Sequence, residues 1–335
     1  MSIYQKNGYL DMAKIMGYKY RNIFVYGGRG PGKTFNSLLH VLQSGVRFMY
    51  LRRTQSQLET LCMEPFNPFK EINRMYGFDA RLEKMGKYAA VVKLGDDIVG
   101  YGASLSTFAN IRSFSAEDIE IIIYDEFVPE KHQKKIPHEY EALMNLYESI
   151  NRNRELDGKP YVKLIGLTNS NDITSPILLG MQLIGTVEKM KSKGMETCPS
   201  PDGETLLIDT MYSPILKEKA NIGFYKTKND AFSRMAVSGD FERVSNSQIK
   251  AQPIAEYSPV VSVGEITLYR HKSKRSRYYC TTHRSGNPPQ YGATEIELQR
   301  FGRSCRWAWQ AYFRNEIIFE DQTCEIILTK YFGLV

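Results

Sequence analysis

A glycine-rich segment early in the chain has the residue types and spacing that hold phosphate groups. Gly27, Gly32, Lys33 and Thr34 match the pattern G-x-x-x-x-G-K-[ST], directly after an apolar run and directly before a helical stretch. The glycines let backbone N–H groups curve around phosphate oxygens, Lys33 reaches the β- and γ-phosphates, and the Thr34 hydroxyl ligates Mg²⁺. We predict a site for ATP and Mg²⁺, with a chance glycine-rich turn as the alternative. The predicted loop consists of Gly27, Gly28, Arg29, Gly30, Pro31, Gly32, Lys33 and Thr34.

The second half of such a site is a buried strand that ends in acids. Asp125 and Glu126 follow the apolar run Ile119 to Tyr124. Asp125 is expected to hold Mg²⁺ through its water shell, and Glu126 is placed to polarise the attacking water as general base. An ordinary strand that ends in a solvated acid pair is the alternative.

Polar residues also follow the next apolar run, Val162 to Leu167. These are Thr168 and Asn169. A polar side chain at this strand tip can sense the γ-phosphate or orient the lytic water, and Asn169 is the candidate. The alternative is an Asn that only forms a turn with the polar residues after it.

Arginines lie at the end of a predicted amphipathic helix over residues 140–150. Arg152 and Arg154 could supply a guanidinium to the ATP site of a neighbouring subunit, because Arg offers a planar, permanently charged group for transition-state charge. Arginines are also favourable at the negative end of a helix dipole. The residues alone do not separate these two interpretations.

Three further arginines are weaker candidates. Arg112 lies in the polar loop ahead of the acidic strand, where it could act in the same way. Arg52 and Arg53 follow the apolar run Val46 to Leu51 and could touch nucleotide or DNA. A solvated charged face is the alternative for all three.

Strands and helices alternate along residues 1–210, which is typical of an α/β domain with a mostly parallel sheet covered on both faces. The chain order leaves room for an added strand between the two motif strands. Together with Glu126 next to Asp125, this favours the P-loop ATPases that hydrolyse ATP to do mechanical work. The runs expected to form the strands are Ile23 to Tyr26, Val46 to Leu51, Ala89 to Leu94, Ile119 to Tyr124, Val162 to Leu167 and Leu206 to Ile208.

Composition excludes several classes of protein. The 335 residues carry 44 Lys and Arg against 37 Asp and Glu, a net charge of +7 that permits a polyanionic partner without requiring one. The 5 cysteines are scattered without a CxxC pair, which indicates a reducing compartment and argues against a disulfide framework or a zinc site. We expect no membrane span and no signal peptide, since no long apolar run occurs.

The expected secondary structure changes after residue 210. Residues 211–250 are expected to form a linker or small helical bridge, and residues 251–335 a small α+β domain. Within that domain we expect strands at Val260 to Tyr269 and Arg277 to Thr282, helix from Thr294 to Phe313, and strands at Ile317 to Phe319 and Ile326 to Tyr331.

This domain is poor in acids and rich in basic residues. Asp321 is the only aspartate after residue 250, so the carboxylate cluster of a two-metal nuclease is not expected. No acid lies between Glu265 and Glu295, where tyrosines at 269, 278 and 279 alternate with basic residues. A phosphate-backbone contact with DNA or a structural RNA is predicted, with a solvated charged turn as the alternative. The residues named for this contact are Arg270, Lys272, Lys274, Arg275 and Arg277.

Taken together, these stretches resemble the DNA-packaging ATPases of phi29-like tailed phages, which are related to the large terminases. The segments GGRGPGKT, FMYLRRTQSQL, IIIYDEF and LTNS, and the residues leading into NRNRE, carry the resemblance over residues 20–170. It implies a homomeric ring of five subunits, docked on the portal of a procapsid in the host cytoplasm, that drives double-stranded DNA inward. A packaging RNA is a further partner that the resemblance leaves open.

The resemblance also carries roles over to individual positions. Lys33, Thr34, Asp125 and Glu126 form the ATP site, and Arg152 matches a trans-acting arginine finger. Arg112 falls where the family has another basic residue proposed to act between subunits. The C-terminal domain resembles a degenerate nuclease of ribonuclease H-like fold.

Two other functions stay open from the sequence. One is a large terminase with an active metal-dependent nuclease, for which Asp321 would be essential. The other is a nucleotide-regulated DNA-binding or assembly protein with little ATP turnover.

Overall fold

The computed structural model describes residues 2–110, 118–129, 136–169, 175–220, 248–274 and 276–333. Arg112 and Arg275, two of the predicted site residues, lie outside the described residues. The chain divides into two compact units. The first comprises Met1–Asp172 and Met190–Phe241, and the second comprises Ile173–Lys189 and Glu242–Val335.

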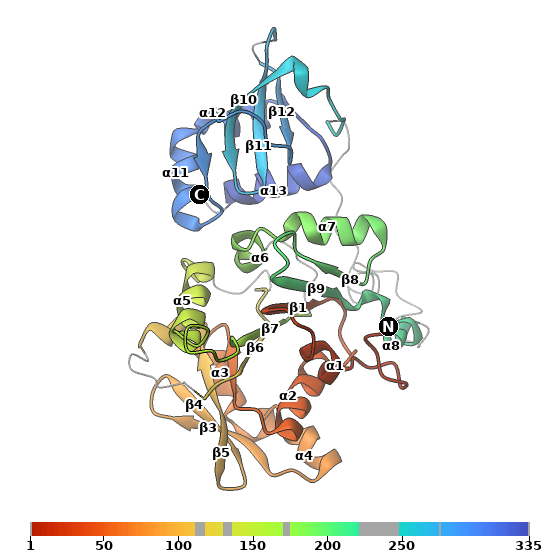
Figure 1. Ribbon diagram of the computed structural model, residues 1–335, viewed down its shortest axis with the longest axis vertical. Coiled ribbons are helices and arrows are strands. Elements are labelled where there is room, and N and C mark those ends of the chain that lie inside the picture. The colour runs from red at the N-terminus through yellow and green to blue at the C-terminus, as the bar shows by residue number, and fades with distance from the viewer. Residues whose placement is uncertain are drawn as a thin grey trace. The chain divides into compact units, whose positions relative to one another are not determined.

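The first unit is built on a 9-stranded sheet of order β3-β4-β5-β2-β6-β7-β1-β9-β8 (Figure 1). The strands from β5 to β9 in this order run parallel, and β3, β4 and β8 pair antiparallel at the two edges. The predicted α/β fold with a mostly parallel sheet is therefore confirmed. The strands are β1 Asn22–Tyr26, β2 Phe48–Arg52, β3 Ala80–Met85, β4 Ala89–Leu94, β5 Asp97–Ser104, β6 Ile121–Asp125, β7 Lys163–Leu167, β8 Thr197–Pro199 and β9 Thr205–Asp209.

Every residue of β1, β2, β6 and β9 is buried, because these central strands are covered on both faces. Alternate strand residues such as Ile23, Val25, Ile121 and Ile123 share one core with the helices that cover their face. The helices before the second unit's sheet are α1 Met12–Met16, α2 Lys33–Ser44, α3 Gln55–Leu61, α4 Lys70–Tyr76, α5 Glu139–Asn151, α6 Pro176–Gly180, α7 Ile184–Lys193 and α8 Pro214–Ala220.

The added strand between the two motif strands is β7. It pairs in parallel with β1 on one side and with β6 on the other. β2 lies on the far side of β6. In register, Leu167 lies opposite both Val25 and Asp125, so the ends of the three strands are level with one another.

The second unit contains a 5-stranded sheet of order β13-β10-β11-β12-β14. β10, β11 and β12 form an antiparallel meander, and β13 and β14 add parallel strands at its edges. The α+β class is confirmed, and the likeness to ribonuclease H stays a prediction. The elements are β10 Tyr257–Val263, β11 Ile266–His271, β12 Tyr278–Thr281, β13 Gln290–Tyr291, α11 Glu295–Ser304, α12 Arg306–Phe313, β14 Ile317–Phe319 and α13 Gln322–Gly333.

Two expectations for this unit are wrong. Val260 to Tyr269 is not one strand, because the chain turns at Gly264, whose φ is 49°, and continues as a second strand. Ile326 to Tyr331 is not a strand but part of α13. Asp321 caps this helix by accepting the Cys324 N–H at 2.9 Å. The buried positions 324, 327, 328 and 331 follow a helical period, a signal that the short apolar run obscured.

Strands β8 and β9 lie in the first sheet, within the expected domain of residues 1–210. The unit boundary differs from the expected division because residues 173–189 group with the second unit. There the Gly185 N–H donates to the Glu265 carboxylate at 3.2 Å, which holds the start of α7 against the turn between β10 and β11. Among the described residues, no helix combines the length and hydropathy of a membrane span.

Candidate nucleotide site

The loop between β1 and α2 has the backbone of a phosphate cradle. Gly27, Gly30 and Gly32 adopt φ values of 115°, 113° and 86°, where side chains are disfavoured. A Cβ on Gly27 would lie 2.6 Å from the Thr210 Oγ1 atom. Helix α2 starts at Lys33 without a side-chain cap, so its first N–H groups and positive dipole end are available to an anion.

Lys33 is held inside this loop. Its Nζ donates to the carbonyl oxygens of Gly27 at 3.1 Å and Gly28 at 2.7 Å, and the side chain is buried. Burial lowers the pKa of Lys33 to about 7, although Asp125 and Asp209 oppose that shift. The ammonium thus sits in a site that penalises its charge until an anion arrives.

We expect the affinity for MgATP to fall as pH rises through 7. Bound phosphates favour the ammonium, so they raise the pKa of Lys33, and binding above pH 7 must take up a proton. The dissociation constant should rise by up to about tenfold per pH unit. Calorimetric titration between about pH 6.5 and 8.5 measures this slope. Lys33→Arg keeps its charge and should flatten it, Lys33→Ala should lose tight binding, and a flat profile in the unchanged protein would contradict the assignment.

Thr34 and Asp125 meet across the ends of β1 and β6. The Thr34 hydroxyl donates to Asp125 Oδ1 at 3.0 Å. The other oxygen of Asp125 accepts from the Tyr50 hydroxyl at 2.7 Å and from Arg52 Nη1 at 2.8 Å. Burial, followed by the Asp125 charge, raises the pKa of Tyr50, so this hydroxyl stays a donor. A hydroxyl beside a buried carboxylate is the oxygen pair that suits Mg²⁺.

Glu126 follows Asp125 in a strained conformation. Its φ of 55° is in the left-handed region, which costs a residue with a side chain roughly 1–3 kcal/mol. Its carboxylate is 38% exposed and forms an ion pair with Arg52 Nη2 at 2.6 Å. The Glu126 carboxylate therefore lies near the surface, whereas the Asp125 carboxylate before it is buried.

The tip of β7 lies beside the P-loop strand. The Thr168 N–H donates to the Val25 carbonyl at 3.1 Å, and Thr168 is buried. Asn169, which follows it, is half-buried. The predicted sensor therefore lies on the strand that separates the two motif strands.

The two arginines after α5 differ in their surroundings. Arg152 is exposed, with a φ of 42°, and its Nε donates to the Ser149 carbonyl at 3.1 Å. Arg154 is half-buried and donates to the carbonyl oxygens of Pro160 at 3.0 Å and Ile119 at 2.8 Å. Arg154 thus holds the loop after α5 to the start of β6, and Arg152 is better placed to reach another molecule.

The sequence missed the roles of the arginine pair after β2. Arg52 forms ion pairs with both acids of the site, and among the described residues its buried Nε has no hydrogen-bond partner. Arg53 is fully buried, so the solvated face considered for it is wrong. It forms a two-pronged ion pair with Glu139 at 2.6 and 2.8 Å, and the Tyr124 hydroxyl donates to the same carboxylate at 3.2 Å. Two arginines directly after an apolar strand were the signal.

Replacing Arg53 with Met should destabilise the first unit by about 3–5 kcal/mol, because Glu139 would keep its buried charge without a partner. Urea unfolding followed by circular dichroism measures this destabilisation. Arg74→Met is the matched control, since Arg74 forms an exposed pair with Glu71 and should cost less than about 1 kcal/mol. Equal losses of unfolding free energy in the two variants would contradict a larger stabilising role for the buried Arg53–Glu139 pair.

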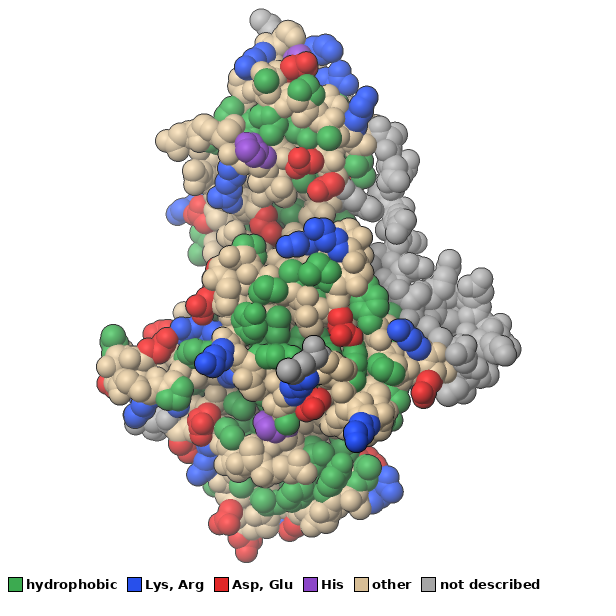
Figure 2. Space-filling view, turned by 45° about the vertical axis from the view of Figure 1, so that its right-hand side comes forward, with side chains coloured by type: hydrophobic (Ala, Val, Ile, Leu, Met, Phe, Trp, Pro, Cys, Tyr) green, Lys and Arg blue, Asp and Glu red, His purple; other side chains and the backbone are tan. Residues whose placement is uncertain are grey.

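In the basic hairpin of the second unit, the Lys and Arg side chains are exposed, whereas the tyrosines pack against other residues of the unit. Arg270, Lys272, Lys274 and Arg277 are exposed at the end where β11 turns into β12. Figure 2 shows Lys and Arg side chains gathered at this end of the second unit. Tyr269 and Tyr279 are buried, and Tyr278 stacks on Trp307 with ring centroids 4.8 Å apart. The expected interleaving of tyrosines with the contact surface is therefore wrong for Tyr269 and Tyr279, because they belong to the core.

Comparison with known sequences decides the family. Residues 4–198 match the model of the family described as Podovirus DNA encapsidation protein (Gp16), which is more than half of the chain. The chain belongs to this family.

The relatives of this encapsidation protein family include two phage proteins described as DNA packaging protein. Those of Bacillus phage PZA and Bacillus phage phi29 are each 27% identical over 189 residues, which cover 55% of this chain and 53% of the relative. The chain thus spans about half the length of the curated relatives it matches. Residues 4–198, which match the family model, contain the P-loop, the acidic strand and Arg152.

Two solved structures share the fold of this chain over nearly its whole length. The structure described as the Phi-28 gp11 DNA packaging motor aligns with a TM-score of 0.62 at 17% identity and covers 98% of each chain. The bacteriophage Phi-29 viral genome packaging motor assembly aligns with a TM-score of 0.60 at 19% identity and covers 99% of each chain. Both similarities extend through the second unit.

Proposed function

We propose that this chain is the motor subunit of a viral genome-packaging machine, which hydrolyses ATP to move double-stranded DNA into a preformed capsid. The observation that carries the proposal is the hydrogen bond from the Thr34 hydroxyl to Asp125 at 3.0 Å, with Lys33 and Glu126 next to these two residues in the chain. The encapsidation family and the relatives described as DNA packaging proteins support the task to which this site is put.

The residues of the site divide the work of hydrolysis. The loop N–H groups and Lys33 bind the phosphates, and Thr34 with Asp125 would hold Mg²⁺, which neutralises charge on the β- and γ-oxygens. Glu126 accepts a proton from the attacking water at its carboxylate, and Asn169 orients that water. Because Arg52 Nη2 occupies the Glu126 carboxylate at 2.6 Å, Glu126 must part from Arg52 to accept that proton.

Arg152 completes the site of a neighbouring subunit in a homomeric ring. Its exposure, one residue beyond α5, supports this assignment over Arg154, which is half-buried and donates to the carbonyl oxygens of Pro160 and Ile119. A ring of five on the portal of a procapsid in the host cytoplasm, with or without a packaging RNA, is the assembly we propose. Arg112 remains a candidate for the same subunit interface.

The experiment that tests the proposal is DNA-stimulated ATP turnover by the assembled protein. We expect double-stranded DNA to raise phosphate release, and Lys33→Ala to remove it. Negligible turnover in assembled rings with DNA would favour a nucleotide-regulated assembly protein instead. We also propose that the chain has no nuclease activity, and plasmid cleavage with Mn²⁺ that Asp321→Ala abolished would overturn this.

Removing cations from the hairpin should weaken DNA binding uniformly across sequences. Lys274→Ala combined with Arg277→Ala should lower the slope of log affinity against log salt by about 0.9 for each DNA phosphate that the hairpin no longer neutralises. Fluorescence anisotropy with two unrelated duplexes at several salt concentrations measures the slope. Lys70→Ala, at an exposed site on α4, is the control. An unchanged slope would assign the hairpin to solvent.

A further inference from the structure

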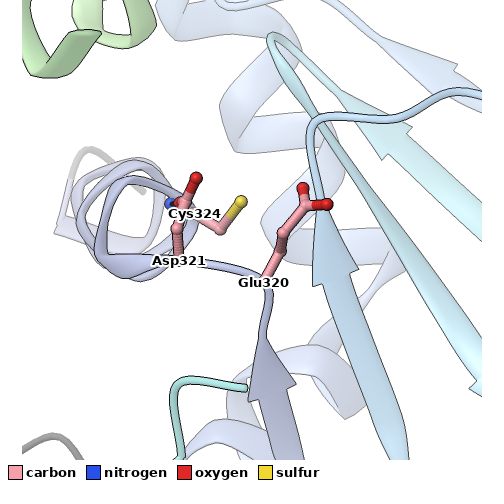
Figure 3. Close-up of side chains that lie close together, drawn as sticks. All are labelled: Glu320, Asp321 and Cys324. Carbon is pink, nitrogen blue, oxygen red and sulfur yellow. Dashed lines mark hydrogen bonds between the residues drawn. The ribbon is translucent and has the colours of Figure 1, made fainter. Parts of the chain in front are cut away.

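The end of β14 and the first turn of α13 bring together ligand groups that the nucleotide site does not use. Glu320, Asp321 and Cys324 each offer one ligand atom, and these atoms lie within 4.8 Å of one another. Figure 3 shows the Cys324 sulfur directed toward the Glu320 carboxylate. The cluster mixes two oxygen donors with a sulfur donor.

A second buried thiol belongs to the same place. Cys280 on β12 and Cys324 on α13 are both fully buried, and the Cys280 sulfur lies 3.9 Å from the Cys324 carbonyl oxygen. Burial raises the pKa of Cys280, and the Cys324 thiol and the charges of Asp321 and Glu320 raise it further. Cys280 thus packs beside Cys324, next to the three ligand groups.

The two carboxylates are oriented but not neutralised. Thr281 donates its hydroxyl to Glu320 Oε2 at 2.5 Å, and the Cys324 N–H donates to Asp321 Oδ1 at 2.9 Å. Glu320 is half-buried and Asp321 is exposed, and within the part of the chain that the structure describes neither acid forms an ion pair. Outer hydrogen bonds that fix carboxylates while leaving one oxygen available are typical of metal ligands.

We propose that Glu320, Asp321 and Cys324 bind a divalent metal ion of the zinc class. A thiolate ligand selects zinc over Mg²⁺ or Mn²⁺, and one sulfur with two carboxylate oxygens leaves the fourth tetrahedral position to water. Zinc bound at about 2.3 Å from sulfur and about 2.1 Å from oxygen needs its ligands closer together than 4.8 Å, so the rotamers must close on the ion. Each thiol that ligates releases its proton.

This site would be structural and not nucleolytic. A two-metal nuclease needs several carboxylates around a pair of hard cations, whereas one of the three donors here is a thiol. The ion would join the end of β14 to the first turn of α13, and so hold the start of the C-terminal helix against the sheet. The inference does not depend on the proposed motor function, because it concerns residues of the second unit alone.

The test uses the full chain, stripped with a chelator and titrated with Zn²⁺, Co²⁺ or Mg²⁺ alone. We expect one Zn²⁺ per chain, a rise in the unfolding temperature on Zn²⁺ binding, and a near-ultraviolet thiolate-to-metal band with Co²⁺. Asp321→Asn, which keeps the cap acceptor, should weaken Zn²⁺ binding by at least about tenfold. Cys324→Ser should remove the Co²⁺ band.

Matched variants keep the outcome decisive. Cys62→Ser changes a half-buried thiol of the first unit and should leave binding unaltered. Lys33→Ala should also leave it unaltered, since its site is the nucleotide site. If Cys324→Ser does not fold, Asp321→Asn and Glu320→Gln decide. Zn²⁺ affinity unchanged in these two variants, absence of the Co²⁺ band, or equal stabilisation by Mg²⁺ would each overturn the proposal.

Discussion

Glu126→Gln is expected to bind ATP normally and to lose turnover by about 10²–10⁴-fold, because an amide cannot accept the proton of the attacking water. The phosphate-binding loop, Lys33 and the Thr34–Asp125 hydrogen bond are untouched by this change. Glu126 lies at the exposed side of the site, so the isosteric replacement should leave the fold intact.

Two measurements separate this result from a loss of binding. Fluorescent-nucleotide titration gives the affinity, and single-turnover phosphate release gives the chemical step. Glu120→Gln is the matched control, since Glu120 is exposed just before the same strand. A normal hydrolysis rate in Glu126→Gln would show that another group is the base.

Arg152→Ala should reduce turnover in assembled rings by about 10³-fold or more, while monomers still bind ATP. The reason is that the guanidinium stabilises charge that develops on the transferred phosphoryl group of the adjacent subunit. Turnover measured on the assembled ring, with affinity measured on the monomer, tests this separation. Lys159→Ala, another exposed cation of the same loop, should have little effect.

Mixed rings give the sharper test of action between subunits. Arg152→Ala subunits keep Glu126, and Glu126→Gln subunits keep Arg152, so some mixed interfaces contain both groups. Partial recovery of turnover on mixing is expected. No recovery at any mixing ratio would place Arg152 in its own subunit's site or outside catalysis.

The sequence predicted the first unit well because its central strands are short, apolar and separated by clear turn and helix signals. Ile121–Asp125 and Lys163–Leu167 were found to within two residues. The strand order was less accessible, since only register and pairing show that β7 separates the two motif strands.

The errors have a common physical origin. Arg53 is charged, so the sequence left it open between contact with nucleotide or DNA and a solvated face, and only a partner far along the chain, Glu139, makes its burial tolerable. Tyr269 and Tyr279 alternate with cations, but the two-residue period of a strand points them to the opposite face. In α13 the segment Ile326 to Tyr331, which begins with three apolar residues, was ambiguous between strand and helix until its neighbours were known.

The adjacent arginines after β2 join the ATP site to α5. Arg52 grips the acids of its own ATP site, while Arg53, one peptide bond away, fixes the first residue of α5, and α5 ends next to Arg152. Neighbouring residues at one strand end thus position both the acids of the candidate nucleotide site and the helix that leads to Arg152. In the ring that we propose, each copy of the chain would hold its own site and present its arginine to the next copy through the same short segment.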